Sequence, residues 1–402
     1  MADRTRHAWW GTAGLFLVHG LVVSTWVSRI PAIQSALQLA NGVLGLALLA
    51  SALGAVSTIP VAGWAVTRYG SKKVTTAASL AFCLSLVLPA LAANAISLAC
   101  ALFIFGGLAA AMDVSMNAQG VEVEKAMRSP TMSRFHGMFS LGGMLGAGAG
   151  GMVAARGIGA LPHFAVSGVT NALGIIAIFG LLLETHLAVG TEHRLPLRKI
   201  PRVLLALSAI AFCILLAEGA IADWTAVYLR QVLHAGPGTA AAGYAVFSAA
   251  MAVFRFLGDA VTARLGPLRT LRAGSLVATA GLLIAMCAFS AAWSLPGFAL
   301  AGAGFSVIIP LVFGSGGRVE GISPGAGIAT VTGIGYAGFI VGPPAIGFAS
   351  QLVTLRYALG IVVACCLISA LLAKSVGSLA HTPSSPDTPP PGSAGPPSGL
   401  YT

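Results

Sequence analysis

Long apolar stretches separated by short polar ones make up most of the chain. A helix needs about 20 apolar residues to cross the roughly 30 Å hydrocarbon core of a bilayer. Twelve stretches have this length, so the pattern predicts an all-α membrane protein with twelve spans. Their approximate bounds are 9–30, 41–64, 74–94, 97–121, 135–155, 164–184, 203–228, 240–261, 271–290, 293–315, 325–348 and 355–374.

The basic residues of the connecting segments predict how the spans are oriented. Cytoplasmic loops of membrane proteins carry an excess of Lys and Arg. With a cytoplasmic N-terminus, 17 of the 22 Lys and Arg residues fall on the cytoplasmic side and one, Arg255, falls within a span. The outer side then receives only Arg29, Arg156, Arg230 and Arg356. This bias predicts that both termini are cytoplasmic, and we expect a multi-pass protein of the cell inner membrane.

The longest internal polar stretch lies near the middle of the chain and divides the spans into two sets of six. It predicts an N-terminal six-helix half at 1–185, a cytoplasmic central loop at 186–202 and a C-terminal six-helix half at 203–375. Residues 376–402 are rich in Pro, Ser and Gly. Because such a segment buries too little apolar surface to fold, we expect a disordered cytoplasmic tail there.

Composition supports a lipid environment and excludes several classes of protein. Hydrophobic residues make up 57% of the chain and charged residues 8%, whereas a soluble domain has roughly 25% charged residues. The net charge of +11 comes from basic residues between apolar stretches, without the interleaved aromatic residues of nucleic-acid sites. The six cysteines lack metal-ligand spacing, and no phosphate-binding loop is present. We therefore expect no nucleic-acid partner, metal, cofactor or enzymatic activity.

A short motif follows the second span of each predicted half. The first copy begins at Gly63 and reads GWAVTRYGSKK, and the second begins at Gly258 and reads GDAVTARLGPLR. Both contain Arg-x-Gly, at Arg68 and Arg264, an offset of 196 residues (264 minus 68). A tight turn needs glycine, which accounts for Gly70. Two copies at matched places indicate duplicated halves.

The twelve-span plan and the repeated motif resemble the major facilitator superfamily over residues 1 to about 375. The family signature after the second helix is Gly-x-x-x-Asp-Arg-x-Gly-Arg-Lys, and Thr67 stands where the family has its acid. In the second half Asp259 can supply an acid, one helical turn from Arg255. The resemblance implies that this loop locks a conformational switch, the first-half lock lacking its acid. It assigns gating to Gly63, Arg68, Gly70, Arg255, Asp259 and Arg264.

Finer features resemble a bacterial subgroup near the fucose permeases. They are Asp113-x-x-x-Asn117-x-Gln119, Phe135-His136-Gly137, Arg29-Ile-Pro31, and Glu218-Gly219 followed by Asp223-Trp224. The family resemblance makes the first, fourth, seventh and tenth helices the lining of a central cavity. It implies alternating access by rocking of the two halves around that cavity.

Ionisable side chains inside the predicted spans are the candidates for a transport site. On translocon scales each costs about 2.5–3.5 kcal/mol at the centre of a helix, so it persists where it faces protein or water. Asp113 and Asn117 lie four residues apart and share one face of the fourth span. Either Asp113 binds a proton or cationic group while Asn117 binds solute, or the pair makes a buried polar contact with another helix. Glu218 lies within the seventh span and is a better candidate for proton coupling than Asp223, which lies nearer the outer face.

Five further residues have both a functional and a structural interpretation. Asp223 lies nearer the outer face, as a gate or a solvated cap, and Trp224 either stacks on a sugar ring or belongs to the interfacial aromatic belt. His19, midway along the first span, relays protons or makes an interhelical hydrogen bond. Trp26 and Arg29 end that helix, where Arg29 attracts an anionic substrate or meets lipid headgroups.

These features predict a monomeric secondary transporter whose partners are a small-molecule substrate and membrane lipid. The expected solute is a sugar or another small polar metabolite, and the expected energy source is the proton gradient. His136 begins the fifth span, where it either gates with Glu122 or Glu124 or joins an interfacial cluster. Two alternatives stay open: a multidrug or metabolite exporter that works by proton antiport, and a non-transporting membrane sensor or scaffold.

Overall fold

The structure is a computed structural model that describes residues 2–129, 131–184 and 200–374, without the side chains of residues 2, 3 and 259. The predicted tail at 376–402 lies outside this part of the chain, as does most of the predicted central loop at 186–202. Within it, 12 helical segments are long and apolar enough to cross a membrane, which confirms the predicted number of spans.

The N-terminal half forms the first six of these segments. Its elements are α1 (Ala2–Val27), α2 (Ile30–Ala36), α3 (Asn41–Tyr69), α4 (Ser71–Ser85), the 3-10 turn η1 (Leu88–Leu91), α5 (Ala95–Met127), α6 (Met132–Ala155), α7 (Ala160–Ile178) and the 3-10 turn η2 (Phe179–Leu181). The first and fourth spans extend furthest beyond their predicted bounds. The first continues through α2, whose Pro31 sits in the first helical turn where a missing N–H costs nothing. The fourth continues past 121, because its charged last turns reach beyond the apolar stretch.

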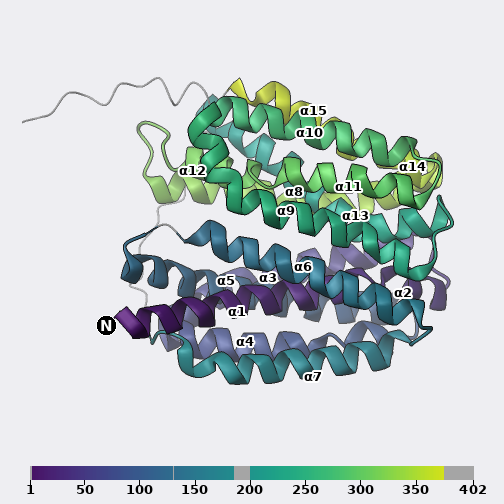
Figure 1. Ribbon diagram of the computed structural model, residues 1–402, viewed down its shortest axis with the longest axis horizontal. Helices are drawn as coiled ribbons and strands as arrows, with labels where there is room; N and C mark the ends of the chain where they lie inside the picture. Colours follow the sequence, from purple (N-terminus) through teal and green to yellow (C-terminus); the bar gives the residue numbers. More distant parts are fainter. Residues whose placement is uncertain (1, 130, 185–199, 375–402) are drawn as a thin grey trace, which may run out of the picture.

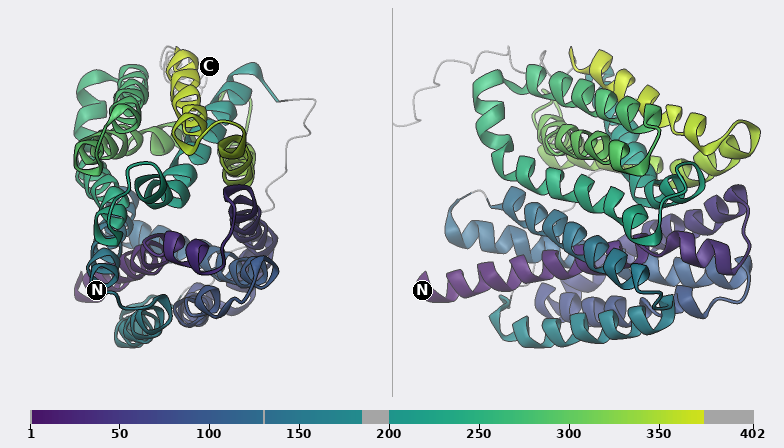
Figure 2. Two further views of the ribbon diagram at one scale, coloured as in Figure 1. Left: turned by 90° about the vertical axis from the view of Figure 1, so that its right-hand side faces the viewer. Right: turned by 45° about the vertical axis from the view of Figure 1, so that its right-hand side comes forward.

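The C-terminal half forms the other six segments. Its elements are α8 (Arg202–Gln231), α9 (Pro237–Leu265), α10 (Pro267–Cys287), α11 (Ala291–Phe305), α12 (Ile308–Gly316), α13 (Pro324–Leu352), α14 (Leu355–Ala358) and α15 (Gly360–Leu372). In Figure 1 the helices of the first half form one layer and those of the second half lie above it. Figure 2, left, looks along the bundle from the end opposite the N-terminus of α1 and shows the two layers facing each other.

Glycines set how closely the helices approach one another. A Cβ added to Gly54 of α3 would collide with the carbonyl of Phe103 in α5, and one added to Gly142 of α6 would collide with the carbonyl of Leu17 in α1. Without a hydrophobic force between helices in lipid, such close backbone contact is a principal source of packing energy. The glycine content of the chain therefore reflects backbone-to-backbone packing within each half.

The repeated motif forms the same turn in both halves. Gly70 separates α3 from α4 with a φ of 85°, and Gly266 separates α9 from α10 with a φ of 77°. Side chains other than glycine are strained at these angles. The two copies thus have one structural cause in common, a sharp turn between the second and third spans of a half.

Two pairs of long helices join the halves. Helix α6 packs against α9, and α3 packs against α13, while α8 also meets α2. Figures 1 and 2 show α6 and α9 side by side at the boundary between the layers. The interface between the halves runs along the helix axes, so a site on α6, α8 or α9 lies where the two halves meet.

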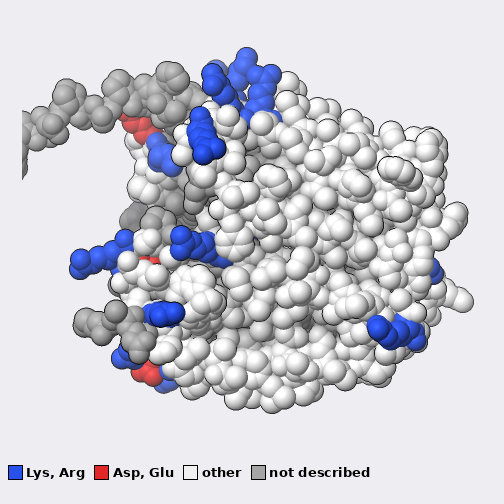
Figure 3. All heavy atoms as spheres, in the orientation of Figure 1, with Lys and Arg blue, Asp and Glu red and all other residues white. Residues whose placement is uncertain are grey.

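The basic side chains gather at one end of the bundle. On the face shown in Figure 3 most Lys and Arg side chains lie at the end that carries the N-terminus, and few lie at the opposite end. We call the first the inner end and the second, where Arg29, Arg156 and Arg230 lie, the outer end. This asymmetry is the one from which the sequence predicts a cytoplasmic N-terminus.

Candidate functional site

An ion pair lies in the middle of the bundle. Glu218 is 16 residues from the first residue of α8 and 13 from its last, which places it about 20 Å from either end. Its Oε1 lies 3.6 Å from Nη2 of Arg255 on α9, with the two side chains 22% and 11% exposed. A lone charge at this depth is costly, so the carboxylate and the guanidinium each offset the cost of burying the other.

The same guanidinium also reaches the other half. Nη1 of Arg255 donates to Oγ of Ser140 at 2.8 Å and to the carbonyl of His136 at 3.2 Å, both on α6. Arg255 therefore binds an acid of its own half through one nitrogen and polar groups of the facing half through another. The structure pairs Arg255 with a neighbouring helix, whereas the sequence pointed to Asp259, whose side chain lies outside the described part.

Asp113 and Asn117 lie on one face of α5, as their spacing predicts. Nδ2 of Asn117 donates to Oδ1 of Asp113 at 3.1 Å and to its carbonyl at 2.8 Å. The phenol of Tyr336 on α13 lies within electrostatic range of both Asp113 and Glu218. Tyr336 thus lies near polar groups of both halves. The sequence did not single it out, because a tyrosine in a glycine-rich span has no distinguishing neighbours.

Two histidines of the first half, His19 and His136, lie among aromatic rings. His19 packs edge-on against Phe82 and Phe139, with ring centroids 5.3 and 5.4 Å apart. Its Nδ1 has no hydrogen-bond partner among the described residues. His136 packs against Phe16 at 5.2 Å and lies within electrostatic range of both His19 and Arg255. Both imidazoles therefore border the region around the ion pair.

The acids near His136 in the sequence have other partners. Glu122 forms an ion pair with Lys125 at 2.9 Å. Glu124 accepts from the backbone N–H groups of Thr131 and Met132 at 3.2 and 3.0 Å, where a carboxylate favours the N-terminus of α6. These contacts favour capping and surface roles for the two glutamates.

Asp223 and Trp224 occupy different surroundings although they are adjacent. Asp223 is half-buried on α8 and lies within electrostatic range of Tyr244. The Trp224 side chain is 0% exposed and belongs to the apolar core. Trp224 is therefore packed in the interior in this conformation, and its two roles stay predictions.

Gln119, part of the subgroup pattern, ties helix ends together. Its Nε2 donates to Oγ of Ser71 and to the carbonyl of Leu183, both at 2.8 Å, and its Oε1 accepts from the Leu183 N–H at 3.2 Å. Gln119 is fully buried. Its place in the pattern therefore has a structural explanation at the inner end of the first half.

Three predicted gating residues of the repeated motif lie toward the inner end: Gly63, Arg68 and Arg264. A Cβ on Gly63 would meet no heavy atom of the described chain within 4 Å. The guanidinium of Arg68 lies 5.9 Å from the ring of Tyr69, and Thr67, which replaces the family's acid, donates to the carbonyl of Trp64 at 2.8 Å. Arg264 ends α9 in the matching place of the second half.

At the outer end three amides join the halves. Nε2 of Gln34 donates to Oδ1 of Asn41 at 2.8 Å, and Nδ2 of Asn41 donates to Oε1 of Gln231 at 3.1 Å. Nε2 of Gln231 donates in turn to Gln34 at 3.2 Å and to Asn41 at 3.1 Å. We call these residues the amide cluster. It links the first half to the end of α8, and the sequence did not predict it because uncharged amides near helix ends carry no distinct pattern.

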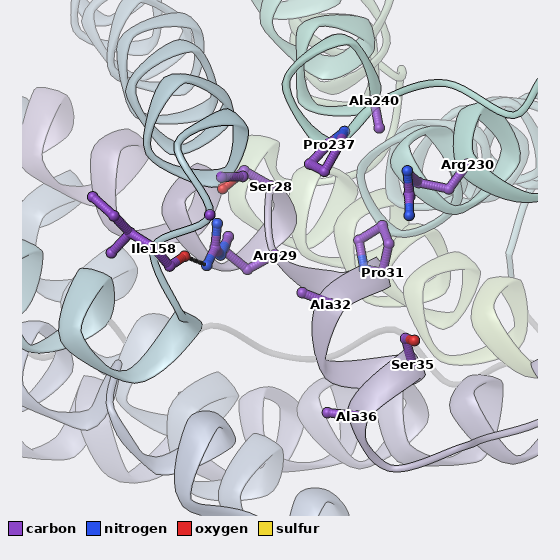
Figure 4. Close-up of a pocket in the computed structure, with 12 residues that line it drawn as sticks. Ser28, Arg29, Pro31, Ala32, Ser35, Ala36, Ile158, Arg230, Pro237 and Ala240 are labelled. Atoms are coloured by element: carbon purple, nitrogen blue, oxygen red, sulfur yellow. Dashed lines mark hydrogen bonds between the residues drawn. The ribbon is translucent and has the colours of Figure 1, made fainter.

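A cavity of about 390 Å³ lies beside the amide cluster. It is lined by Ser28, Arg29, Pro31, Ala32, Ser35, Ala36, Ala154, Gly157, Ile158, Arg230, Pro237 and Ala240 (Figure 4). Arg29 is 3% exposed and donates to the carbonyl of Ile158. Trp26, one turn earlier, is 5% exposed and packs between Phe105 and Phe164. Arg29 is therefore held inside the protein rather than among lipid headgroups.

The candidate metal ligands of the described chain are its His, Cys, Asp and Glu side chains. Within the described ranges no group of three His, Cys, Asp or Glu side chains is placed to hold a metal ion. The six cysteines are free, four of them buried within the helices. The polar groups that remain are the ion pair, the Asp113–Asn117 pair, the amide cluster and the outer cavity.

Comparison with known proteins agrees with the fold. The sequence profile of the Major Facilitator Superfamily matches residues 12–318. An uncharacterized MFS-type transporter of Yersinia pestis is 35% identical over 362 residues, 90% of this chain and 94% of that protein. The uncharacterized transporter y4wD of Sinorhizobium fredii is 33% identical, over 87% of this chain and 92% of that protein.

Solved structures resemble the chain in fold. A bacterial homologue of the human lysosomal transporter Spinster, inward-facing and unoccupied, aligns with a TM-score of 0.74 and 14% identity over 96% of this chain and 100% of that one. FucP in its outward conformation aligns with a TM-score of 0.61 and 19% identity over 90% of this chain and 97% of that one. At these identities the likeness concerns the fold alone.

Proposed function

Because the chain belongs to the Major Facilitator Superfamily, we propose that it moves a small polar solute across the bacterial inner membrane by alternating access, driven by proton entry. Members of this family are transporters rather than enzymes and need no cofactor. The observation that carries the proposal is the Glu218–Arg255 ion pair, whose guanidinium also binds α6 of the other half.

The ion pair offers a way for a proton to change how the halves are held. While Glu218 is ionised, its charge offsets that of Arg255 and helps to keep the guanidinium in place against Ser140. A proton on Glu218 removes that charge and leaves Arg255 without its acid. The hydrogen bonds from Arg255 to α6 then weaken, and rocking of the halves becomes easier.

The Asp113–Asn117 pair supplies polar groups for a solute near the same region. Both side chains are partly exposed, on α5, and Tyr336 lies within electrostatic range of Asp113. Carboxylate, amide and phenol groups bind hydroxyl-rich solutes through several hydrogen bonds. A sugar or another small polar metabolite suits this set. Two of the similar structures are named as a fucose:proton symporter and a nucleoside transporter, which supports a polar solute.

The amide cluster fits the role of an outer gate. It joins α8 to the start of α3 at the outer end, where Gly45 of α3 also lies against the backbone of α13 at Pro343. Hydrogen bonds among neutral amides are modest in net energy, about 0.5–1.5 kcal/mol each. Such a cluster can therefore break and re-form within a transport cycle.

The proposal is tested with purified protein in proteoliposomes under an inward proton gradient. Labelled monosaccharides and nucleosides are offered from outside, with protein-free liposomes as the control. We expect at least one solute to accumulate above its outside concentration and a protonophore to abolish the accumulation. Flux that is equal with and without the gradient contradicts proton coupling, and no flux of any solute contradicts this substrate class.

Export is the second candidate, and one relative favours it. A protein named Multidrug resistance protein 2 of Bacillus subtilis is 28% identical over 182 residues, 45% of this chain. Everted membrane vesicles decide between the two directions, because their outer surface is the cytoplasmic one. Proton-driven uptake of dyes into everted vesicles supports export, and uptake of polar solutes only into right-side-out vesicles supports import.

A further inference from the structure

The outer cavity holds two cations and no acid. Arg29 comes from the break between α1 and α2 and Arg230 from the end of α8, and both line the same space of about 390 Å³ (Figure 4). Its other lining residues are neutral. The sequence places no Asp or Glu in any of the predicted outer segments. Two guanidinium groups thus share one cavity without a carboxylate to balance them.

The hydrogen-bonding capacity of these arginines is largely unused. A guanidinium has five N–H donors and no acceptor. Arg29 donates to the carbonyl of Ile158, yet its buried Nε has no partner in the described part of the chain. Arg230 donates to the carbonyl of Ala235 at 2.6 Å. A buried donor without a partner is unfavourable, and an acceptor inside the cavity would offset that cost.

A helix end adds to the positive potential. Helix α9 begins at Pro237, and Pro237 and Ala240 both line the cavity. The N-terminus of a long helix carries a partial positive charge and favours anions. The hydroxyl-bearing Ser28 and Ser35 complete the polar lining.

From these contacts we infer that the outer cavity is a binding site for a small oxyanion, a carboxylate or phosphate group, that enters from the external solution. Arginine binds both groups through paired N–H donors. The rim residues Ala32, Ser35, Gly157 and Arg230 are exposed, so the site opens to the outside, while Arg29 forms its buried base.

The bound anion bridges the two halves. Arg29 and Ser35 belong to the first half, whereas Arg230 and Pro237 belong to the second. An anion between them favours the conformation in which the outer ends stay together, because a ligand shifts the equilibrium toward the state that binds it better. The site is therefore a means by which an external anion slows outward opening. This inference does not depend on proton coupling.

Thermal unfolding of the purified protein in maltoside micelles tests the site. Sodium phosphate and sodium acetate are titrated against sodium chloride at equal ionic strength. A ligand that binds only the folded protein raises its midpoint of unfolding, so we expect phosphate or acetate to raise it and chloride not to. Arg29→Gln and Arg230→Gln should each weaken the anion affinity about tenfold or more, the loss expected for a charged hydrogen bond.

Arg156→Gln is the matched control, because Arg156 is an outer arginine that does not line the cavity and donates to the carbonyl of Met152. It should leave the anion effect unchanged. Arg29 is buried, so Arg29→Gln can fail to fold. In that case Arg230→Gln still decides the test, because Arg230 is exposed. Equal midpoints in phosphate, acetate and chloride overturn the inference, and so does an equal loss in Arg156→Gln. Stabilisation by phosphatidylglycerol alone overturns the assignment to a solute in favour of a lipid headgroup.

Discussion

Arg255 carries a charge into the middle of a span, and its neighbours explain how it is tolerated. One nitrogen faces Glu218 and another donates to Ser140 and the carbonyl of His136. Removing one partner of a buried pair leaves the other charge uncompensated, which is more costly than never burying either. The chemistry of this site therefore depends on the protonation state of a single carboxylate.

Glu218→Gln tests that dependence at the scale of the residue. The amide keeps the size of the side chain but cannot exchange a proton, so we expect exchange of solute to continue and uphill accumulation to cease. For one coupled proton, one pH unit supports about tenfold accumulation, which the variant should lose. The measurement is the ratio of internal to external labelled solute in proteoliposomes.

Glu122→Gln is the control for the same chemical change. Glu122 pairs with Lys125 near the inner end of α5, away from the ion pair. Its accumulation ratio should match that of the unchanged protein. Accumulation that persists in full in Glu218→Gln would remove Glu218 from the coupling role.

Residue spacing predicted some of these contacts and missed others for one reason. The four-residue spacing of Asp113 and Asn117 predicted their shared face, and the structure joins them directly. Spacing describes one helix at a time. It could not indicate Glu218, which lies on a neighbouring helix, and the pairing of Arg255 with Asp259 stays a prediction because the Asp259 side chain lies outside the described part. For the same reason the sequence places Arg230 only among the outer cations. The fold is what brings Arg230 and Arg29 to the lining of one cavity.

The helices themselves were the most predictable part of the molecule. Length and hydropathy fix a span because the bilayer has one thickness, and all twelve predicted stretches are helical. The breaks within spans were not predicted. The first span breaks between α1 and α2, at the polar Ser28 and Arg29, and the tenth breaks between α11 and α12. Apolar residues flank the second break, so packing decides the direction of the chain there.

Two glycines of α3 give a matched test of packing at the scale of the element. A methyl group on Gly54 would collide with the carbonyl of Phe103, while one on Gly63 meets open space among the described residues. Gly54→Ala should destabilise the protein by about 1–3 kcal/mol, the range for an overpacked site. Gly63→Ala should be neutral or slightly stabilising, because alanine favours a helix more than glycine does.

The measurement is the midpoint of thermal unfolding of both variants in the same detergent. Gly54→Ala should have the lower midpoint. Equal midpoints would mean that the α3–α5 contact relaxes freely and that glycine is not needed there. A lower midpoint for Gly63→Ala than for Gly54→Ala would contradict the packing of α3 altogether.

At the scale of the whole molecule, the two halves touch through different kinds of contact at different depths. The outer end is joined by the amide cluster, and the middle is joined by the hydrogen bonds from Arg255 to Ser140 and to the carbonyl of His136. The predicted division at residues 186–202 falls outside the described chain, so the domain boundaries remain a prediction. The predicted twelve-helix fold in two six-helix halves is confirmed by the fold and the family.

Locking the outer gate should stop transport. Asn41 and Gln231 donate hydrogen bonds to each other across the halves, so we expect Asn41→Cys with Gln231→Cys to be joined by a short bis-methanethiosulfonate cross-linker, which attaches to each thiol through a reducible disulfide. Because the halves could then no longer separate at the outer end, solute uptake should fall to the level of protein-free liposomes and recover after reduction.

The background for this test replaces the exposed Cys100 and Cys287 with serine. Each single variant, Asn41→Cys or Gln231→Cys, serves as the control and should transport equally before and after treatment. Full uptake by the cross-linked double variant would show that the amide cluster is not part of a gate.

Proton movement coupled to solute is the most direct measurement of the proposed function. Proteoliposomes that contain a pH-sensitive dye receive, on their outside, a solute that the flux experiment has identified. Symport predicts that adding the solute acidifies the lumen, and that Glu218→Gln abolishes this acidification while solute still crosses. Solute entry without any change in internal pH, or with alkalinisation of the lumen, would contradict proton-driven import.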